Sequence, residues 1–269
     1  MQENKLRELL KAGKPTLGTH LHSSWPAIVE LVGHSRMFDY VEFVAEYAPF
    51  DLNGLENLCR TAELFDLSSM IKVDQEPRTF LAQRGIGAGF HSVLFADCRS
   101  AADARECIKA ARPDTPEDEG SYGAGLRRQA YKLRFRGAPM EQIQKDYVQA
   151  IRDVVVVLMI EKKGAVEQLE EILSLPGVDM IQWGAADYTI SVGRPGQWTS
   201  PETKAVEKRV FETALKMGVP PRCEINSPDA AKYYLDMGVR HFCIGSDVMV
   251  WFDWCRKNGE AMRKALEGA

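Results

Sequence analysis

The sequence has no long apolar run and no marked excess of charge of either sign. Its longest uninterrupted apolar run, residues 154–160, is far too short to cross a bilayer. The formal net charge is -4, and lysine and arginine are scattered rather than gathered on one stretch, so nothing in the sequence favours binding to a phosphate backbone. We therefore expect neither a membrane nor a nucleic acid as a partner.

The sequence also lacks paired cysteines and a recognisable leader. Its six cysteines lie far apart with no C-x-x-C pair, which excludes an evident zinc knuckle or redox dithiol, and we expect buried or semi-buried free thiols. The first 15 residues carry charges where a signal peptide would carry an apolar stretch. A cytoplasmic protein is the resulting expectation.

What the sequence does have is a regular alternation of short β-rich runs with longer segments of helical period, typical of repeated βα units. With 45% hydrophobic and 27% charged residues, residues 1–269 are expected to form one domain. The pattern predicts a single (β/α)8 TIM barrel of the α/β class, with an open doubly wound sheet as the alternative. The eight predicted strands are Thr16–Leu21, Tyr40–Ala45, Ser69–Val73, Ser92–Phe95, Val154–Ile160, Met180–Trp183, Arg222–Ile225 and His241–Ile244.

Several helix boundaries carry specific signals. Ser100, Ser200 and Ser227 stand where an N-cap would accept hydrogen bonds from free backbone amides, and proline follows the last two. Gly218 and Gly238 stand where helices are expected to end in a left-handed residue. We interpret the G-x-G-x-G segment at residues 85–89 as a turn, because it precedes a strand instead of linking a strand to a helix.

One connection is unusually long. Residues 113–125 read PDTPEDEGSYGAG, and loops of this length are often functional. Arg127 and Arg128 follow it, and either an acidic part of a substrate or solvent could face them.

In a barrel of this kind the active site lies at the carboxyl ends of the strands. The polar residues at or just beyond the predicted strand ends are His20, His22, Glu46, Tyr47, Lys72, Asp74, Glu161, Asp187 and Glu224. These residue types are metal ligands and acid–base groups, so the expected site is catalytic.

Two of these acids predict a metal site. Glu161 ends an apolar row of one strand parity, and Asp187 closes the next unit, so neighbouring strands bring both carboxylates to one edge of the sheet. Two carboxylates with water suit a hard cation such as Mg²⁺ or Mn²⁺. The alternative interpretation is structural, with both acids in the first turns of helices.

At this point the residues resemble the HpcH/HpaI family of class II pyruvate aldolases over about residues 17–250. The segments that carry the resemblance are Glu46–Pro49, Met70–Lys72, Ala102–Glu106, Val157–Glu161, Gly184–Asp187 and Tyr234–Gly238. The resemblance implies a (β/α)8 barrel in which Glu161 and Asp187 hold Mg²⁺, Mn²⁺ or Co²⁺. It also implies that the backbone amides of Ala186 and Asp187 bind the carboxylate of a 2-oxo acid, with Gly123 near them.

The departures from the family pattern concern proton transfer. The family motif is aspartate-x-glutamate-histidine-alanine-proline, and here Val44 and Tyr47 replace the aspartate and the histidine of the acid–base dyad. Lys72 takes the place of an arginine, keeping the charge but losing the bidentate fork. Met159 replaces a glutamine often found two residues before the metal glutamate.

We therefore predict a divalent-metal-dependent carbon–carbon lyase, an aldolase, that acts on a 2-oxo acid through a pyruvate-type enolate, with an aldehyde as the second compound. Lys72 is expected to stabilise the oxyanion, and the candidate bases are a metal-bound water, Tyr47, His20 and His22. One alternative is a 2-oxo acid decarboxylase of oxaloacetate type in the same site. Another is a barrel that binds metal or ligand with little turnover.

The carboxyl-terminal segment VMVWFDWC, residues 248–255, is more apolar than an exposed helix needs and is expected to pack on another surface. The resemblance implies trimers or hexamers with exchanged carboxyl-terminal helices. We accordingly expect a homo-oligomer.

Overall fold

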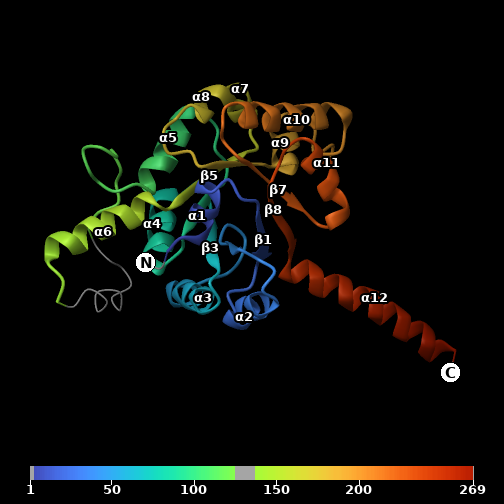
Figure 1. The fold of residues 1–269 in the computed structure, drawn as a ribbon. Coiled ribbons are helices and arrows are strands. Elements are labelled where there is room, and N and C mark those ends of the chain that lie inside the picture. The colour runs from blue at the N-terminus through green and yellow to red at the C-terminus, as the bar shows by residue number, and fades with distance from the viewer. Residues whose placement is uncertain (1–2, 125–136, 269) are drawn as a thin grey trace.

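The computed structural model describes residues 3–124 and 137–268, and its centre is a closed sheet of eight parallel strands in chain order (Figure 1). The predicted (β/α)8 barrel is thereby confirmed, and the open sheet is excluded. Each strand begins and ends within two residues of its predicted bounds. The strands are β1 (Thr16–Leu21), β2 (Tyr40–Val44), β3 (Ser68–Val73), β4 (Ser92–Phe95), β5 (Val155–Ile160), β6 (Met180–Trp183), β7 (Pro221–Ile225) and β8 (His241–Ser246).

Helices surround the barrel, and their caps follow the sequence signals. The side chains of Ser100, Ser200 and Ser227 accept hydrogen bonds from backbone amides of the following turn, as predicted. Gly218 and Gly238 both adopt positive φ. The helices are α1 (Lys5–Lys11), α2 (Pro26–Ser35), α3 (Leu52–Leu64), α4 (Arg78–Ala88), α5 (Ala101–Ala110), α6 (Met140–Arg152), α7 (Lys163–Glu167), α8 (Leu169–Leu173), α9 (Ala185–Ser191), α10 (Pro201–Lys216), the 3₁₀ turn η2 (Pro228–Ala230), α11 (Ala231–Asp236) and α12 (Asp247–Glu267).

The strands are apolar because both faces of the closed sheet are covered. All six residues of β5 are buried, with alternate side chains facing the barrel interior and the helices. Near the amino ends of the strands, Leu6 of α1 packs fully buried against Tyr40, Met70 and Met180. This apolar layer leaves the carboxyl ends of the strands as the place for polar chemistry.

The G-x-G-x-G segment is not a turn, and that prediction was wrong. Gly85 and Gly87 lie inside α4, and only Gly89, with a φ of 124°, ends the helix. A Cβ on Gly85 would lie 2.9 Å from Cγ2 of Ile71, so the glycine lets α4 pack closely on β3. The requirement for glycine here comes from helix–strand packing.

Helix α12 extends away from the barrel, opposite the side that carries α6 (Figure 1). It contains no buried residue, and Trp251, Phe252 and Trp254 are each more than half exposed. Cys255 is also exposed on this helix, which corrects the expectation of buried thiols; the other five cysteines are buried. Among the described helices, none is long and apolar enough to cross a membrane.

Candidate active site

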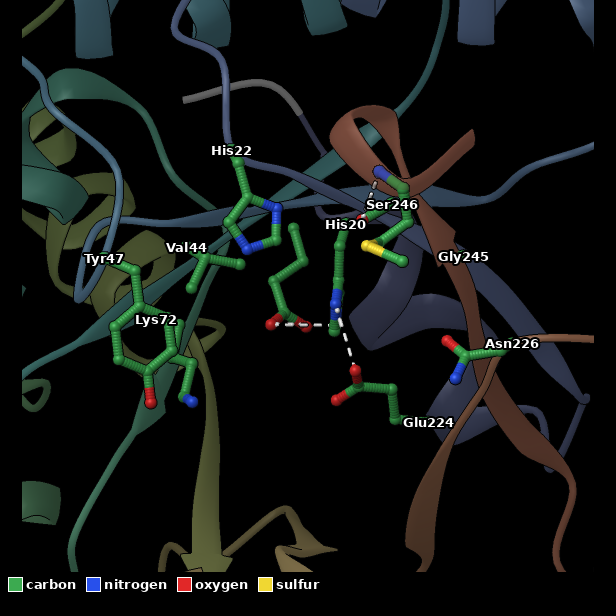
Figure 2. A pocket seen from close by; sticks show the side chains of 11 residues that line it. His20, His22, Val44, Tyr47, Lys72, Glu224, Asn226, Gly245 and Ser246 are labelled. Carbon is green, nitrogen blue, oxygen red and sulfur yellow. Dashed lines mark hydrogen bonds and ion pairs between the residues drawn. The ribbon is translucent and has the colours of Figure 1, made fainter. Parts of the chain in front are cut away.

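Polar side chains from five strands gather at the carboxyl end of the barrel around a cavity of about 200 Å³. Figure 2 shows His20 in its middle, with Glu224 on one side and Tyr47 and Lys72 on the other. The three predicted catalytic residues therefore share one cavity: His20 of β1, Lys72 of β3 and Tyr47 just beyond β2. Its lining is His20, His22, Glu42, Val44, Tyr47, Lys72, Glu224, Asn226, Gly245, Ser246 and Met249.

Lys72 ends the inward row of β3 and is held by two groups that follow β2. Its Nζ lies 2.6 Å from Oε2 of Glu46 and 4.9 Å from the centroid of the Tyr47 ring. Burial alone would lower the pKa of Lys72, but the charges of Glu46, Tyr47 and Glu161 together outweigh it and raise the pKa. Desolvation raises the pKa of Tyr47 to about 12, which makes this phenol a poor base at neutral pH.

Glu161 follows β5 and is buried, with 3% of its surface exposed. Its Oε1 accepts a hydrogen bond of 2.8 Å from the backbone amide of Asp97, which adopts a left-handed φ of 57°. A Cβ on Gly184 would collide with Oε2, so glycine leaves the space that this carboxylate occupies. Burial raises the pKa of Glu161 to about 7, and the charge of Lys72 opposes the rise.

Asp187 lies in the first turn of α9, beside Ala186, whose carbonyl accepts a hydrogen bond from Thr189. Its Oδ1 lies 2.8 Å from Nζ of Lys162, which also lies 2.5 Å from Oδ1 of Asp97. The backbone amides of Ala186 and Asp187 belong to the first helical turn, where no carbonyl four residues earlier is available within the helix. Asp187 also repels the charge of Glu161, so the two acids act on one another.

His20 lies between two carboxylates inside the barrel. Its Nε2 is 3.2 Å from Oε1 of Glu42, and its Nδ1 is 3.4 Å from Oε1 of Glu224. The side chain of Glu42 is fully buried, whereas that of Glu224 is 46% exposed. Burial alone would lower the pKa of His20, but Glu42 and Cys243 together outweigh it and hold the pKa well above its usual value.

The two carboxylates are joined behind His20 through a fully buried arginine. Arg222 of β7 forms an ion pair with Glu42 and donates a hydrogen bond to Gln182. Gln182 in turn donates to Oε2 of Glu224 over 3.2 Å. Glu42, Arg222, Gln182, Glu224 and His20 thus form a closed ring of side chains from four strands, which we call the interior ring.

Cys243 of β8 lies beside this ring. Among the described residues, His20, Glu42 and Cys243 are the group of three whose ligand atoms lie within 4.8 Å of one another, close enough to share a metal ion. The guanidinium of Arg222 already pairs with Glu42, and the charge of Lys72 acts on it as well. Two positive charges so near oppose the binding of a divalent cation at this place.

The sequence did not single out five residues of this region, Glu42, Asp97, Lys162, Gln182 and Arg222. Glu42 and Arg222 carried a usable signal, since charged residues at inward positions within a predicted buried strand require partners. By contrast, Gly123 is exposed, its carbonyl accepts a hydrogen bond from Tyr147 of α6, and no contact of the described residues joins it to the cavity. Arg127 and Arg128 lie outside the described residues.

A closed eight-stranded barrel with acids and a lysine at its carboxyl end defines a (β/α)8-barrel enzyme site. The family model of the HpcH/HpaI aldolase/citrate lyase family matches residues 18–251. The chain belongs to this family. Its predicted class, a carbon–carbon lyase, is confirmed by that membership and by the aldolases among its relatives.

Two relatives are similar over nearly the whole chain. A hydroxypyruvate/pyruvate aldolase of Paraburkholderia phytofirmans is 26% identical over 268 residues, covering 98% of this chain and 96% of that protein. A 4-hydroxy-2-oxo-heptane-1,7-dioate aldolase of Escherichia coli is 26% identical, covering 91% and 89%. The solved structure of an HpcH/HpaI aldolase from Desulfitobacterium hafniense, 23% identical, superposes with a TM-score of 0.85 over 97% of both chains and shares the fold.

Proposed function

We propose that this protein is a divalent-metal-dependent aldolase that cleaves or forms a carbon–carbon bond next to a 2-oxo acid. The observation that carries the proposal is the buried carboxylate of Glu161 at the carboxyl end of the barrel, near enough to Lys72 for the charge of that ammonium to lower its pKa. Such a pair places acceptors for a cation and a positive charge for an oxyanion on one side of the same site.

The acids suit a hard cation. Glu161 is a buried carboxylate whose pKa lies near 7, so its ionised form is costly there unless a positive charge accompanies it. The partner acid, Asp187, already holds a cation, the ammonium of Lys162. Glu161 and Asp187 would hold Mg²⁺ or Mn²⁺, or Co²⁺, through carboxylate oxygens, and the bound ion would polarise the keto group of the substrate.

The protein's own residues supply the remaining functions. Lys72 stabilises the negative charge that develops on the oxygen at C2 when the bond between C3 and C4 breaks. The amides of Ala186 and Asp187 orient the substrate carboxylate. Tyr47 covers Lys72 from the solvent side as an exposed ring, and its high pKa favours an orienting role over that of a base.

The substrate class follows from the relatives. Their names specify hydroxypyruvate, pyruvate and 4-hydroxy-2-oxo acids, all of which share the 2-oxo acid group. We infer that this chain takes a 2-oxo acid together with an aldehyde.

We also propose a homo-oligomer in which a second copy of the chain covers α12. The apolar residues of this 21-residue helix are exposed, and its base borders an apolar groove with Trp25, Ile28 and Leu31 of the α2 region. Exposed apolar area of this extent on both surfaces is typical of an interface between subunits.

The test is pyruvate release from 4-hydroxy-2-oxo-heptanedioate, followed with lactate dehydrogenase after adding Mg²⁺, Mn²⁺, Co²⁺ or EDTA. We expect turnover with a divalent ion and none with EDTA. Glu161→Gln and Asp187→Asn should lose activity and tight Mn²⁺ binding, whereas Glu212→Gln, an exposed acid of α10, should retain both. Equal rates with and without metal, or wild-type turnover in either site variant, would remove the proposed metal site.

A further inference from the structure

The replacement of the family dyad by Val44 and Tyr47 leaves the hydroxyl proton of an aldol substrate without an assigned acceptor. Tyr47, with a pKa near 12, does not meet that need at neutral pH. The cavity contains another acid–base group on the opposite side from Tyr47, on β7 (Figure 2). This group is Glu224, the partly exposed member of the interior ring.

We propose that Glu224 is the acid–base residue of the aldol step, and that His20, Glu42 and Arg222 position it and hold its proton. The inference rests on the proposed aldolase function and adds a catalytic group to the cavity that Lys72 lines. The family's dyad stands at the end of β2 and just beyond it. In this chain, Glu224 on β7, supported by His20 on β1 and Glu42 on β2, would do its work.

The geometry supports Glu224 as the residue that faces the substrate, with His20 and Glu42 behind it. Glu224 is the one carboxylate of the interior ring that is substantially exposed to the cavity, with 46% of its side chain accessible. Behind it, 3.4 Å away, lies Nδ1 of His20, and behind His20, 3.2 Å away, lies the fully buried Glu42. Arg222 fixes Glu42 from below, and Gln182 holds the second oxygen of Glu224. A carboxylate held at both oxygens has a defined direction toward its substrate.

The charges support it as well. Glu42 and Arg222 neutralise one another. Burial alone would raise the pKa of Glu42, but the charges of Arg222 and His20 lower it. His20, whose pKa lies well above its usual value, places its imidazole next to the carboxylate of Glu224. The groups that face His20 are Glu42 on β2, Glu224 on β7, Cys243 on β8 and His22, which lies just beyond β1. Lys72 on β3 acts on Glu42.

The step is balanced without a further reagent. Glu224 takes the proton of the C4 hydroxyl, the bond between C3 and C4 breaks, and its electron pair forms the C2–C3 double bond of the enolate while the aldehyde leaves. Glu224 then returns the same proton to C3 and gives pyruvate. The carboxylate ends in the state in which it began.

Three reactions of the protein with Mg²⁺ test the proposal. Glu224→Gln should lower kcat/KM for aldol cleavage by about 10²–10⁴-fold, the usual contribution of an acid–base group, and should abolish deuterium exchange at the methyl group of pyruvate in D2O, read by proton NMR. Release of CO2 from oxaloacetate, a bond cleavage that needs no base, should be little changed, because Glu224 acts only on the later protonation of the enolate. Glu224→Asp should retain part of the cleavage activity, and Glu212→Gln should behave as wild type.

The positioning role is tested by pH dependence. His20→Gln should remove the alkaline limb of the kcat/KM profile that loss of the imidazolium proton produces, while a thermal unfolding scan controls for folding. An unchanged profile in a folded variant would overturn the positioning role. Unchanged cleavage and exchange in Glu224→Gln would overturn the proposal itself.

The remaining outcomes separate this inference from the function on which it rests. If wild-type protein neither cleaves, exchanges nor decarboxylates with any of the metals, the proposed function fails and the inference with it. If all three reactions proceed equally in Glu224→Gln, the function stands and only the inference fails. Stoichiometric binding of added Zn²⁺ that is lost in Cys243→Ser would also overturn it, because the ion would occupy Nε2 of His20.

Discussion

Nζ of Lys72 and Oε2 of Glu46 lie 2.6 Å apart, and both side chains are nearly buried. The glutamate is the central residue of the family motif, whereas the lysine replaces an arginine, so the pair joins a retained residue to a changed one. Because a lysine has no planar fork, it can turn its ammonium to Glu46 while its charge still acts on Glu161. This ion pair fixes the position of the charge that the proposed enolate requires.

Replacing that charge should harm every reaction that passes through the enolate. Lys72→Met is expected to lower kcat for aldol cleavage and for oxaloacetate decarboxylation alike, by about 10²–10³-fold, as loss of one oxyanion-stabilising group does. Lys72→Arg is the control, since it keeps the charge and restores the family's residue type. A loss confined to one of the two reactions would contradict a role at their common oxyanion.

Glu161 predicts a dependence of metal-free stability on pH. Its pKa rises on folding from 4.5 to about 7, so the folded state binds the proton more tightly than the unfolded state does. The contribution of Glu161 to the free energy of unfolding is therefore fully present below about pH 4.5, and it is lost as the pH rises through about 7. Glu161→Gln removes the effect and should stabilise the metal-free protein above pH 7, by up to about 3 kcal/mol.

Urea unfolding in EDTA measures this directly. At pH 5 the wild type and Glu161→Gln should have similar free energies of unfolding, whereas at pH 8.5 the variant should be the more stable of the two. Adding Mn²⁺ at pH 8.5 should then stabilise the wild type but not the variant. A variant less stable than wild type at pH 8.5 without metal would show that Glu161 is not a strained, buried acid.

The barrel could be predicted from the sequence because its strands are buried on both faces and bounded by polar residues. β1, β4 and β6 have their predicted bounds, and β5 begins one residue late, at Val155. The positions of Glu161, Lys72 and His20 at the carboxyl end followed from the same pattern. Periodicity places a residue on a strand and on a face, and that information is local.

What could not be predicted depends on which distant side chains meet. Glu42 and Arg222 are 180 residues apart in sequence, and nothing local indicates that they pair inside the barrel. Gly85 of α4 was misread for a related reason. Its cause is the approach of Ile71 from β3, a contact that no spacing rule contains.

Helix α12 predicts an assembly that depends on its apolar face. The rings of Trp251 and Trp254 stack 5.2 Å apart on the exposed helix, next to the groove beside α2. Trp251→Glu with Trp254→Glu, or deletion of the residues after Asp247, should lower the oligomeric state measured by light scattering. Lys257→Glu, an exposed change on the same helix, should leave the mass unchanged. An unaltered mass in the tryptophan variant would count against the interface.

The last prediction concerns the lost dyad. Val44 and Tyr47 line the same cavity as Glu224 but lie on the other side of His20 (Figure 2). Restoring the family residues with Val44→Asp and Tyr47→His should therefore supply a second acid–base group near Lys72, where the ring of Tyr47 now lies. With Glu224 in place, aldol cleavage should rise little, because the hydroxyl proton already has an acceptor, and decarboxylation should stay constant. Without Glu224, the gain in aldol cleavage should reach about 10²–10⁴-fold.

The strongest form of this experiment combines the restored dyad with Glu224→Gln. If Glu224 does the work of the missing histidine, the single variant should be inactive in cleavage, and the combined variant should recover because the proton has an acceptor again. Val44→Asp alone is the control, since an aspartate without its histidine supplies orientation but no base. If Glu224→Gln alone loses no cleavage activity, the proton leaves by another route. Rapid cleavage that survives both Glu224→Gln and His20→Ala would point to hydroxide as the base.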